Sequence, residues 1–333
     1  MSISTPTNKA TLPTLIYGTG FLGTPSTFPT VDSTLTLLQF LKSHGVTHLD
    51  SARRYPALIP GLAESLLGSA GAAKAGFTID SKIKISPVDG AEESLIPAKI
   101  AASVEESYTA LQLDQPRGKV IDTLYPHAPD PVTPIAETAR GFDVMFRAGR
   151  FLHLGLSNYS AVQIEEWMLA CEERGYVRPS VYQGQYNPLC RRLEEDGLLE
   201  CLRKYGMRLN AFSPLAGGFL SGKASKGERE GTRFEGGNKM GGMARGLYDR
   251  PVMHAAVRKL QAVIEPLGME MTECVMRWLM HHSVLGEGDG VIVGGSKLET
   301  IGRNVVDAGK GPLPGVVVRA VEEMWVMVRD EAP

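Results

Sequence analysis

Short apolar runs alternate with helix-like segments along the chain, and this alternation limits the possible fold more than any other feature. The runs are rich in Val, Ile, Leu, Phe and Tyr and are bounded by glycine or polar residues, as buried strands are. We expect strands over residues 15–19, 46–52, 77–83, 120–125, 151–157, 180–185, 208–212 and 291–293. Buried strands that recur between helices indicate a parallel sheet.

Apolar residues at helical spacing occupy the intervals between the runs. The first helix should have Asp32 or Ser33 as its N-cap, and Ser160 and Gly175 should bound the fourth. Eight strand–helix units in 333 residues predict one domain, residues 1–333, folded as an α/β (β/α)8 TIM barrel with a long loop after the seventh strand and a C-terminal helix. The expected helices cover residues 34–44, 97–111, 134–148, 161–174, 195–205, 252–267, 272–282, 298–308 and 316–328.

An open, doubly wound sheet is the main alternative to the barrel. Gly18, Gly20 and Gly23 match the glycine spacing of a dinucleotide-binding turn. However, Thr24 and Pro25 follow where a helix should begin. We therefore interpret these glycines as a tight turn at the barrel rim.

Charge and cysteine usage limit the partners and the compartment. The net charge of −2, with no long basic run and no long apolar stretch, argues against nucleic-acid and membrane partners. The 4 cysteines form no C-x-x-C pair, which is typical of free thiols in a reducing, cytoplasmic location. His281 and His282 have no His or Cys partner at a metal-ligand spacing, so we expect no metal site.

The functional residues of a (β/α)8 barrel lie at the carboxyl ends of its strands. In this chain those segments read LDSARRY (49–55), DSKI (80–83), LYPHAPD (124–130), GLSNYS (155–160), VYQGQYN (181–187) and AFSPLAGGFLSGK (211–223). Together they resemble the aldo-keto reductase superfamily, most closely its aflatoxin-aldehyde and succinic-semialdehyde reductase branch. The resemblance spans nearly the whole chain and implies nicotinamide-dependent reduction of an aldehyde or ketone.

The resemblance implies a catalytic tetrad of Asp50, Tyr55, Lys82 and His127. Carbonyl reduction requires a proton donor, and a tyrosine with a pKa of about 10 is a poor one until its phenolate is stabilised. We expect the Lys82 ammonium to lower the Tyr55 pKa and Asp50 to hold Lys82. His127 would donate a hydrogen bond to the substrate oxygen. An ordinary ion pair and a packed rim tyrosine are the alternatives.

The resemblance also implies an NADPH cofactor lying extended across the barrel mouth, with Asp50 near the nicotinamide. Ser157, Asn158 and Gln183 would bind its carboxamide, and Phe212 would stack on its ring. Residues expected to line the pyrophosphate are Ser213, Leu215, Gly217, Gly218 and Lys223. Paired glycines permit the close approach of backbone amides to phosphate.

The adenosine end of the cofactor would lie after the eighth strand, where a helix N-terminus favours anions. Many family members have an arginine near the position of Thr300 to bind the 2′-phosphate, and here Lys297, Arg303 and Arg233 remain for that role. The expected contacts are Arg233, Gly294, Ser296, Lys297, Thr300, Arg303 and Asn304. A solvated helix face is the alternative for Lys297 and Arg303.

The substrate is a small carbonyl compound whose identity the sequence leaves open. By resemblance, Tyr248 with Arg245 or Arg250 would contact it, beside His127. Residues 243, 247 and 248 are equally compatible with a contact between subunits of a homodimer. A second functional class is a nicotinamide-binding regulatory module, like the channel β subunits of the same fold, but that lineage departs from the reductases at the position of His127.

Overall fold

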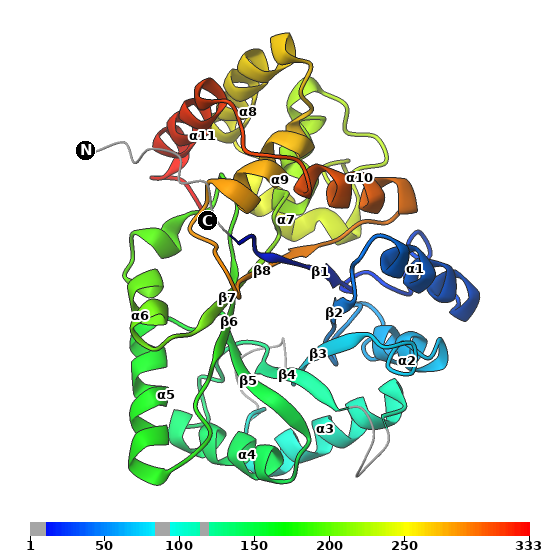
Figure 1. Ribbon diagram of the computed structural model, residues 1–333, viewed down its shortest axis with the longest axis vertical. Coiled ribbons are helices and arrows are strands. Elements are labelled where there is room, and N and C mark those ends of the chain that lie inside the picture. Colours follow the sequence, from blue (N-terminus) through cyan, green and yellow to red (C-terminus); the bar gives the residue numbers. More distant parts are fainter. Residues whose placement is uncertain (1–10, 84–93, 114–119) are drawn as a thin grey trace.

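The eight expected strands form a closed parallel barrel in chain order, which confirms the predicted (β/α)8 fold. The computed structural model describes residues 11–83, 94–113 and 120–333 (Figure 1). β1 closes the barrel by pairing with both β2 and β8. The strands are β1 Thr14–Gly18, β2 His48–Asp50, β3 Thr78–Ile83, β4 Ile121–Pro126, β5 Phe151–Ser157, β6 Val181–Gln185, β7 Arg208–Phe212 and β8 Gly290–Val293.

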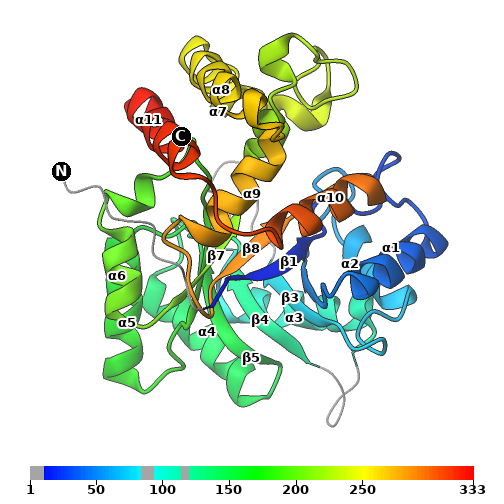
Figure 2. The same cartoon turned by 45° about the horizontal axis from the view of Figure 1, so that its top comes forward.

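Helices surround the barrel and connect its strands (Figure 1). In both views α8 and α11 lie side by side, and their surfaces are linked by an ion pair between Lys259 and Glu323 at 2.7 Å (Figures 1 and 2). The α-helices are α1 Val31–Ser43, α2 Leu62–Ser69, α3 Pro97–Leu111, α4 Ile135–Arg147, α5 Ala161–Arg174, α6 Leu198–Lys204, α7 Gly242–Tyr248, α8 Pro251–Ile264, α9 Met271–His281, α10 Leu298–Ala308 and α11 Gly315–Val328.

Two details of the helices differ from the sequence predictions. The N-cap of α1 is Thr30, not Asp32 or Ser33; Ser33 instead completes a reciprocal capping box with Thr30, so the helix begins three residues earlier. The helices α2 and α7 were not predicted. The N-cap position of α2 is Gly61 at φ 86°, which offers no side-chain cap, and α7 lies in a glycine-rich loop whose composition hides it.

Polar side chains pack inside the barrel in successive layers. Near its middle, the Asn210 amide donates to the Tyr125 hydroxyl at 3.2 Å. Gly155 is required beside them, because a Cβ there would lie 2.2 Å from the Tyr125 ring. Lys82 lies in the next layer toward the carboxyl ends of the strands, with its Nζ 5.7 Å from the centre of the same ring. Tyr125 and Asn210 therefore lie beneath Lys82, at the end of the barrel where the sequence predicts catalysis.

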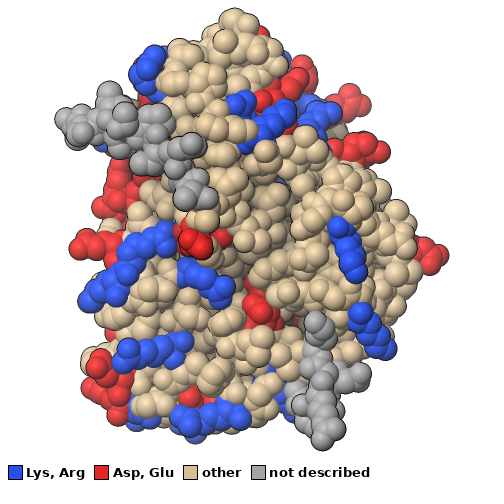
Figure 3. Space-filling model, in the orientation of Figure 1, with Lys and Arg blue, Asp and Glu red and all other residues tan. Residues whose placement is uncertain are grey.

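The surface carries charges of both signs. On the face seen in Figure 3, Lys and Arg side chains form small groups, with uncharged surface and Asp and Glu side chains between the groups. Among the described residues, no helix is both long enough and apolar enough to span a bilayer.

Candidate active site

Asp50 and Lys82 form a buried ion pair at the carboxyl ends of β2 and β3. The Lys82 Nζ donates to Asp50 Oδ1 at 2.6 Å and to the Ser51 carbonyl at 2.8 Å. The Gln183 amide donates to the same Asp50 oxygen at 2.8 Å. Lys82 and Asp50 are only 1% and 2% exposed. Burial opposes the charged lysine, but the pairing with Asp50 outweighs it and raises the pKa of Lys82, so the ammonium persists at neutral pH.

Tyr55 and His127 lie next to this ion pair. Tyr55 is in the loop that follows β2, with the Lys82 Nζ 5.1 Å from the centre of its ring. His127 comes directly after β4, and its ring meets the Tyr55 ring edge-on, with 5.5 Å between the ring centres. All four residues of the expected tetrad are thus brought together at one end of the barrel.

Two opposing effects set the pKa of Tyr55. Burial raises the pKa of the phenol above its ordinary value, and the Lys82 charge opposes this rise without reversing it. Lys82 thus lowers the Tyr55 pKa as expected, but burial outweighs it and the net shift of the pKa is upward. Tyr55 keeps its proton throughout the neutral range, while Lys82 is placed to stabilise the phenolate that forms when the proton leaves.

His127 is neutral at physiological pH. Burial, with contributions from the Lys82 and Arg54 charges, lowers the pKa of His127 to about 3. Its Nδ1 is buried and has no hydrogen-bond partner among the described residues. A neutral imidazole is a much weaker acid than an imidazolium, so His127 suits hydrogen bonding and Tyr55 suits proton donation. Arg54, whose charge reaches both rings, was not singled out from the sequence.

A buried glutamate, also missed from the sequence, supports the loop that carries Tyr55. Glu64 in α2 is 0% exposed; it accepts from Ser81 Oγ at 2.6 Å and from Arg53 Nη1 at 2.8 Å. Arg53 and Ser81 are each within two residues of the tetrad, and the Arg53 amide also donates to the Lys82 carbonyl at 3.1 Å. Glu64 therefore connects α2, the Tyr55 loop and β3. No sequence signal marked it, because α2 was not predicted.

The residues expected to bind the carboxamide line the same end of the barrel. Asn158 follows β5 at φ 63°, and its amide donates to the His127 carbonyl at 2.9 Å and to Ser157 Oγ at 3.1 Å. Gln183, in β6, contacts Asp50 as described above. A non-glycine residue at positive φ is strained and typical of a functional site. Asn158 therefore links the ends of β4 and β5 beside the tetrad.

The backbone after β7 is shaped as a cradle. Phe212 ends the strand, and the carbonyl of Ser213, which has φ 55°, accepts from the Asn187 side-chain amide at 3.0 Å. Gly217 and Gly218 continue at φ 66° and 98°. A Cβ on Gly218 would meet no atom within 4 Å, so its backbone borders open space. The Ala216 and Gly218 amides already donate to the Ser213 and Leu215 carbonyls at 2.9 and 2.8 Å. The open space beside Gly218, with exposed Lys223 in the same segment, allows a phosphate group to approach this backbone.

Arg233 lies across from this cradle. Its guanidinium stacks 3.9 Å from the centre of the Phe21 ring, and it has no carboxylate partner among the described residues. Its Nη1 is 3.9 Å from where a Cβ on Gly217 would stand. Burial lowers the pKa of Arg233, so the charge is partly desolvated without a counter-ion. A bound anion would supply one, and Phe21 was not anticipated as its partner.

The segment after β8 presents both polar and charged side chains at the start of α10. Lys297 is the N-cap residue, and Ser296, Lys297, Thr300 and Arg303 are exposed. Asn304 is 1% exposed, its amide lies 3.5 Å from the Gly294 carbonyl, and its Oδ1 is buried with no partner among the described residues. These groups fit the adenosine end of a dinucleotide, because they combine a helix N-terminus, two cations and an unsatisfied acceptor.

The three loop side chains considered for substrate contact have partners within the protein. Tyr248 is 1% exposed, and its hydroxyl accepts from Gln185 and Asn187. Arg245 donates to three backbone carbonyls, those of Arg233, Glu235 and Asn238. Arg250 likewise donates to the Glu331 and Gly246 carbonyls. These contacts order the long loop after β7, and a direct substrate contact by Arg245 or Tyr248 remains a prediction.

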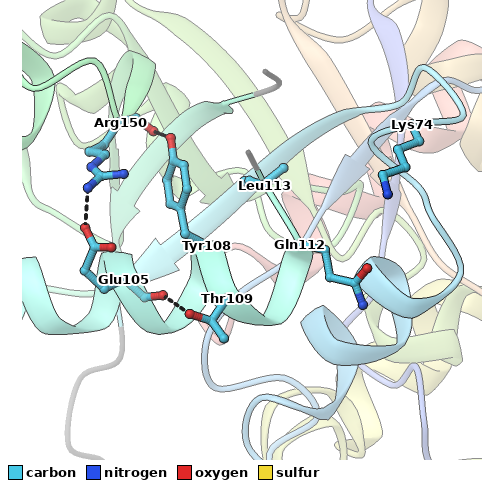
Figure 4. Close-up of a pocket in the computed structure, with 7 residues that line it drawn as sticks. All are labelled: Lys74, Glu105, Tyr108, Thr109, Gln112, Leu113 and Arg150. Carbon is cyan, nitrogen blue, oxygen red and sulfur yellow. Dashed lines mark hydrogen bonds and ion pairs between the residues drawn. The ribbon is translucent and has the colours of Figure 1, made fainter. Parts of the chain in front are cut away.

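A depression on the described surface is lined by residues outside the tetrad. It has a volume of about 470 Å³. Figure 4 shows the residues that line it beside α3. Its polar groups engage one another: Arg150 pairs with Glu105 at 2.7 Å, and Thr109 donates to the Glu105 carbonyl at 2.9 Å. None of its lining residues touches the tetrad, so we do not connect it with carbonyl chemistry.

Comparisons with known proteins identify the family of this chain. Residues 14–326 match the model of the "Aldo/keto reductase family". The chain is 36% identical over 312 residues to aflatoxin B1 aldehyde reductase member 2 of Rattus norvegicus, covering 90% of this chain and 82% of the relative. It is 36% identical over 298 residues to human aldo-keto reductase family 7 member A3, covering 87% of each. It is 30% identical over 332 residues to the aldo-keto reductase pigE of Monascus ruber, covering 95% and 94%. The chain therefore belongs to the aldo/keto reductase family.

Proposed function

We propose that this protein is an NADPH-dependent oxidoreductase that reduces an aldehyde or ketone to an alcohol, with Tyr55 as the proton donor. The observation that carries the proposal is the group formed by Tyr55, the buried Lys82–Asp50 pair and neutral His127. The names of the relatives, which include aldehyde reductases, support carbonyl reduction.

Each residue of the tetrad has a different role in the reduction of the carbonyl group. A bound nicotinamide supplies a hydride to the carbonyl carbon. Tyr55 gives its proton to the oxygen, since its raised pKa keeps it protonated until the oxygen becomes basic. Lys82 stabilises the resulting phenolate, and Asp50 holds Lys82 at 2.6 Å. His127 orients the oxygen by a hydrogen bond, which its neutral state permits. In the reverse direction Tyr55 would accept the proton.

Three groups of residues would bind the nicotinamide cofactor. Ser157, Asn158 and Gln183 would hold the carboxamide beside Asp50, with Phe212 against the ring. The cradle of residues 213–218, with Lys223, would bind the pyrophosphate. Arg233, expected from the sequence at the 2′-phosphate, is proposed at the pyrophosphate instead, because its Nη1 is 3.9 Å from where a Cβ on Gly217 would stand. Lys297 and Arg303, two exposed cations without an ion-pair partner among the described residues, support a preference for the 2′-phosphate of NADPH despite the threonine at position 300. Gly294, Ser296 and Asn304 would contact the adenosine.

A regulatory module with little turnover is not favoured, because His127 is present and lies against Tyr55. A cytoplasmic location and a homodimer remain predictions from the sequence. Two experiments test the proposal. Titration of the protein with NADPH and NADH, followed by fluorescence quenching, should give tighter binding of NADPH, and equal affinities would contradict the 2′-phosphate assignment. A screen of NADPH oxidation over aldehydes, diketones and aromatic ketones should find a substrate, and no turnover of any carbonyl would overturn the enzymatic role.

A further inference from the structure

The opposite end of the barrel, where the strands begin, contains a second cluster of titratable side chains. His48 is the first residue of β2, Asp80 lies in β3, and Asp122 lies near the start of β4. One nitrogen or oxygen atom from each of the three lies within 4.8 Å of the others. None of these residues takes part in the proposed carbonyl chemistry. The cluster therefore needs an explanation of its own.

Asp80 has an unsatisfied oxygen in this cluster. It is 0% exposed, and its Oδ1 accepts from the Thr123 amide at 3.2 Å and lies 2.9 Å from His48 Nε2. Its Oδ2 is buried and has no hydrogen-bond partner among the described residues. A buried carboxylate oxygen without a partner costs free energy, and such groups are rare in native proteins. A ligand that coordinates this oxygen would remove that cost.

A small cavity adjoins the cluster. It has a volume of about 70 Å³, and both His48 and Asp122 line it. This is room for about two water molecules, at about 30 Å³ each. Arg208 brings one positive charge to the lining, while the carboxylate of Asp289, also in the lining, is already paired with Arg203 at 2.7 Å. Asp122 Oδ2 accepts from Thr123 Oγ1 at 3.1 Å, and Asp80 Oδ2, without a partner among the described residues, is left to interact with an occupant of the cluster.

We propose that His48, Asp80 and Asp122 bind one divalent transition-metal ion of the zinc class, with water from the cavity completing its coordination. One imidazole nitrogen and two carboxylate oxygens form a ligand set that suits Zn²⁺ or Co²⁺ better than Mg²⁺ or Ca²⁺, which prefer oxygen alone. Ligand atoms around tetrahedral zinc lie about 3.3 Å apart, as Zn–ligand bonds of about 2.0 Å require. Small side-chain movements within the 4.8 Å cluster reach that spacing.

The position of this site gives it a structural role. The three ligands come from neighbouring strands, because β2 pairs with β3 and β3 pairs with β4. One ion would link the starts of all three strands at the end of the barrel associated with stability rather than catalysis. Binding to the folded chain alone stabilises it by mass action, so the metal should raise the unfolding temperature. Carbonyl reduction does not require it.

The test uses the full-length protein after chelator treatment, titrated with Co²⁺ and separately with Zn²⁺. We expect visible absorption bands from bound Co²⁺, with saturation near one ion per chain, and a higher unfolding temperature with Zn²⁺. Asp122→Asn and His48→Gln should each weaken Co²⁺ binding by at least about tenfold, since even the loss of a group behind a metal ligand costs that much. His281→Gln, which removes a histidine on α9, is the matched control and should bind normally.

Two results would overturn the proposal. Wild-type protein that gives no Co²⁺ absorption and no thermal shift with Zn²⁺ would mean that the cluster holds only protons and water. Unchanged binding in Asp122→Asn would mean that the ion binds elsewhere, and this variant is informative even if His48→Gln fails to fold, because Asp122 is only half-buried. NADPH-dependent turnover, measured in parallel, should survive chelation, so failure of the metal site and failure of the proposed function are separable.

Discussion

The Lys82→Met substitution tests whether the buried ammonium assists Tyr55. Coulomb's law with an effective dielectric constant of about 20 gives about 3 kcal/mol for unit charges at the 5.1 Å between Lys82 Nζ and the Tyr55 ring centre. If the phenolate loses this stabilisation, turnover should fall by about two orders of magnitude. The alkaline limb of the pH profile should also move upward, since the Tyr55 pKa loses the charge that opposes its rise.

Stability must be measured with activity, because the same substitution leaves Asp50 buried without its cation. Breaking a buried pair by removing one partner costs about 3–5 kcal/mol. Asp50→Asn combined with Lys82→Met should therefore recover part of the lost unfolding temperature without recovering turnover. Lys74→Met, at an exposed lysine, is the matched control. A folded Lys82→Met protein with turnover within tenfold of wild type and an unmoved pH profile would refute the role of Lys82.

Three further predictions follow from the site. Glu64→Gln should lower the free energy of unfolding by about 2–3 kcal/mol, since it weakens one buried and one partly buried hydrogen bond. Glu106→Gln, at the exposed partner of the same Arg53, should cost less than about 1 kcal/mol in chemical denaturation, and equal costs would refute the difference. Because the pKa of His127 is about 3 and that of Tyr55 is raised, kcat/KM for reduction should show no inflection from either group between about pH 5 and 8, and a histidine-like limb assigned to His127 there would contradict its neutral state. Arg233→Ala should weaken the binding of NADPH and of NADH alike, by about tenfold or more in a fluorescence titration. Arg303→Ala should weaken the binding of NADPH only. If Arg233→Ala instead weakened NADPH binding alone, Arg233 would be assigned to the 2′-phosphate and not to the pyrophosphate.

The sequence predicted the barrel because each strand carries its own local signal. Runs such as 151–157 and 208–212 are apolar and bounded by polar or glycine residues, and the structure places strands at the same residues. Elements without such a signal were missed. α2 begins after Gly61 without a capping side chain, so its eight residues did not stand out. The same reason hid Glu64, whose burial depends on a helix that was not predicted.

The order of the motifs along the chain predicts that Asp50, Tyr55, Lys82 and His127 lie together. It does not predict which of these side chains are charged. The direction of the Tyr55 pKa shift depends on whether burial or the Lys82 charge has the larger effect. The extent of burial comes from packing that no local sequence pattern encodes. The His48, Asp80 and Asp122 cluster is hidden for a related reason. Its members are far apart in sequence and meet only through strand pairing, so a search for short metal-ligand spacings passes over it.

Tyr55→Phe is the most direct test of the claim that Tyr55 protonates the substrate. The substitution keeps the ring that packs against His127 and removes only the hydroxyl. NADPH affinity by fluorescence titration should stay within about threefold of wild type, while single-turnover reduction of the best substrate should slow by at least about 100-fold, the lower range for loss of a general acid. A single-turnover rate within tenfold of wild type, with NADPH bound normally, would contradict the proposed mechanism.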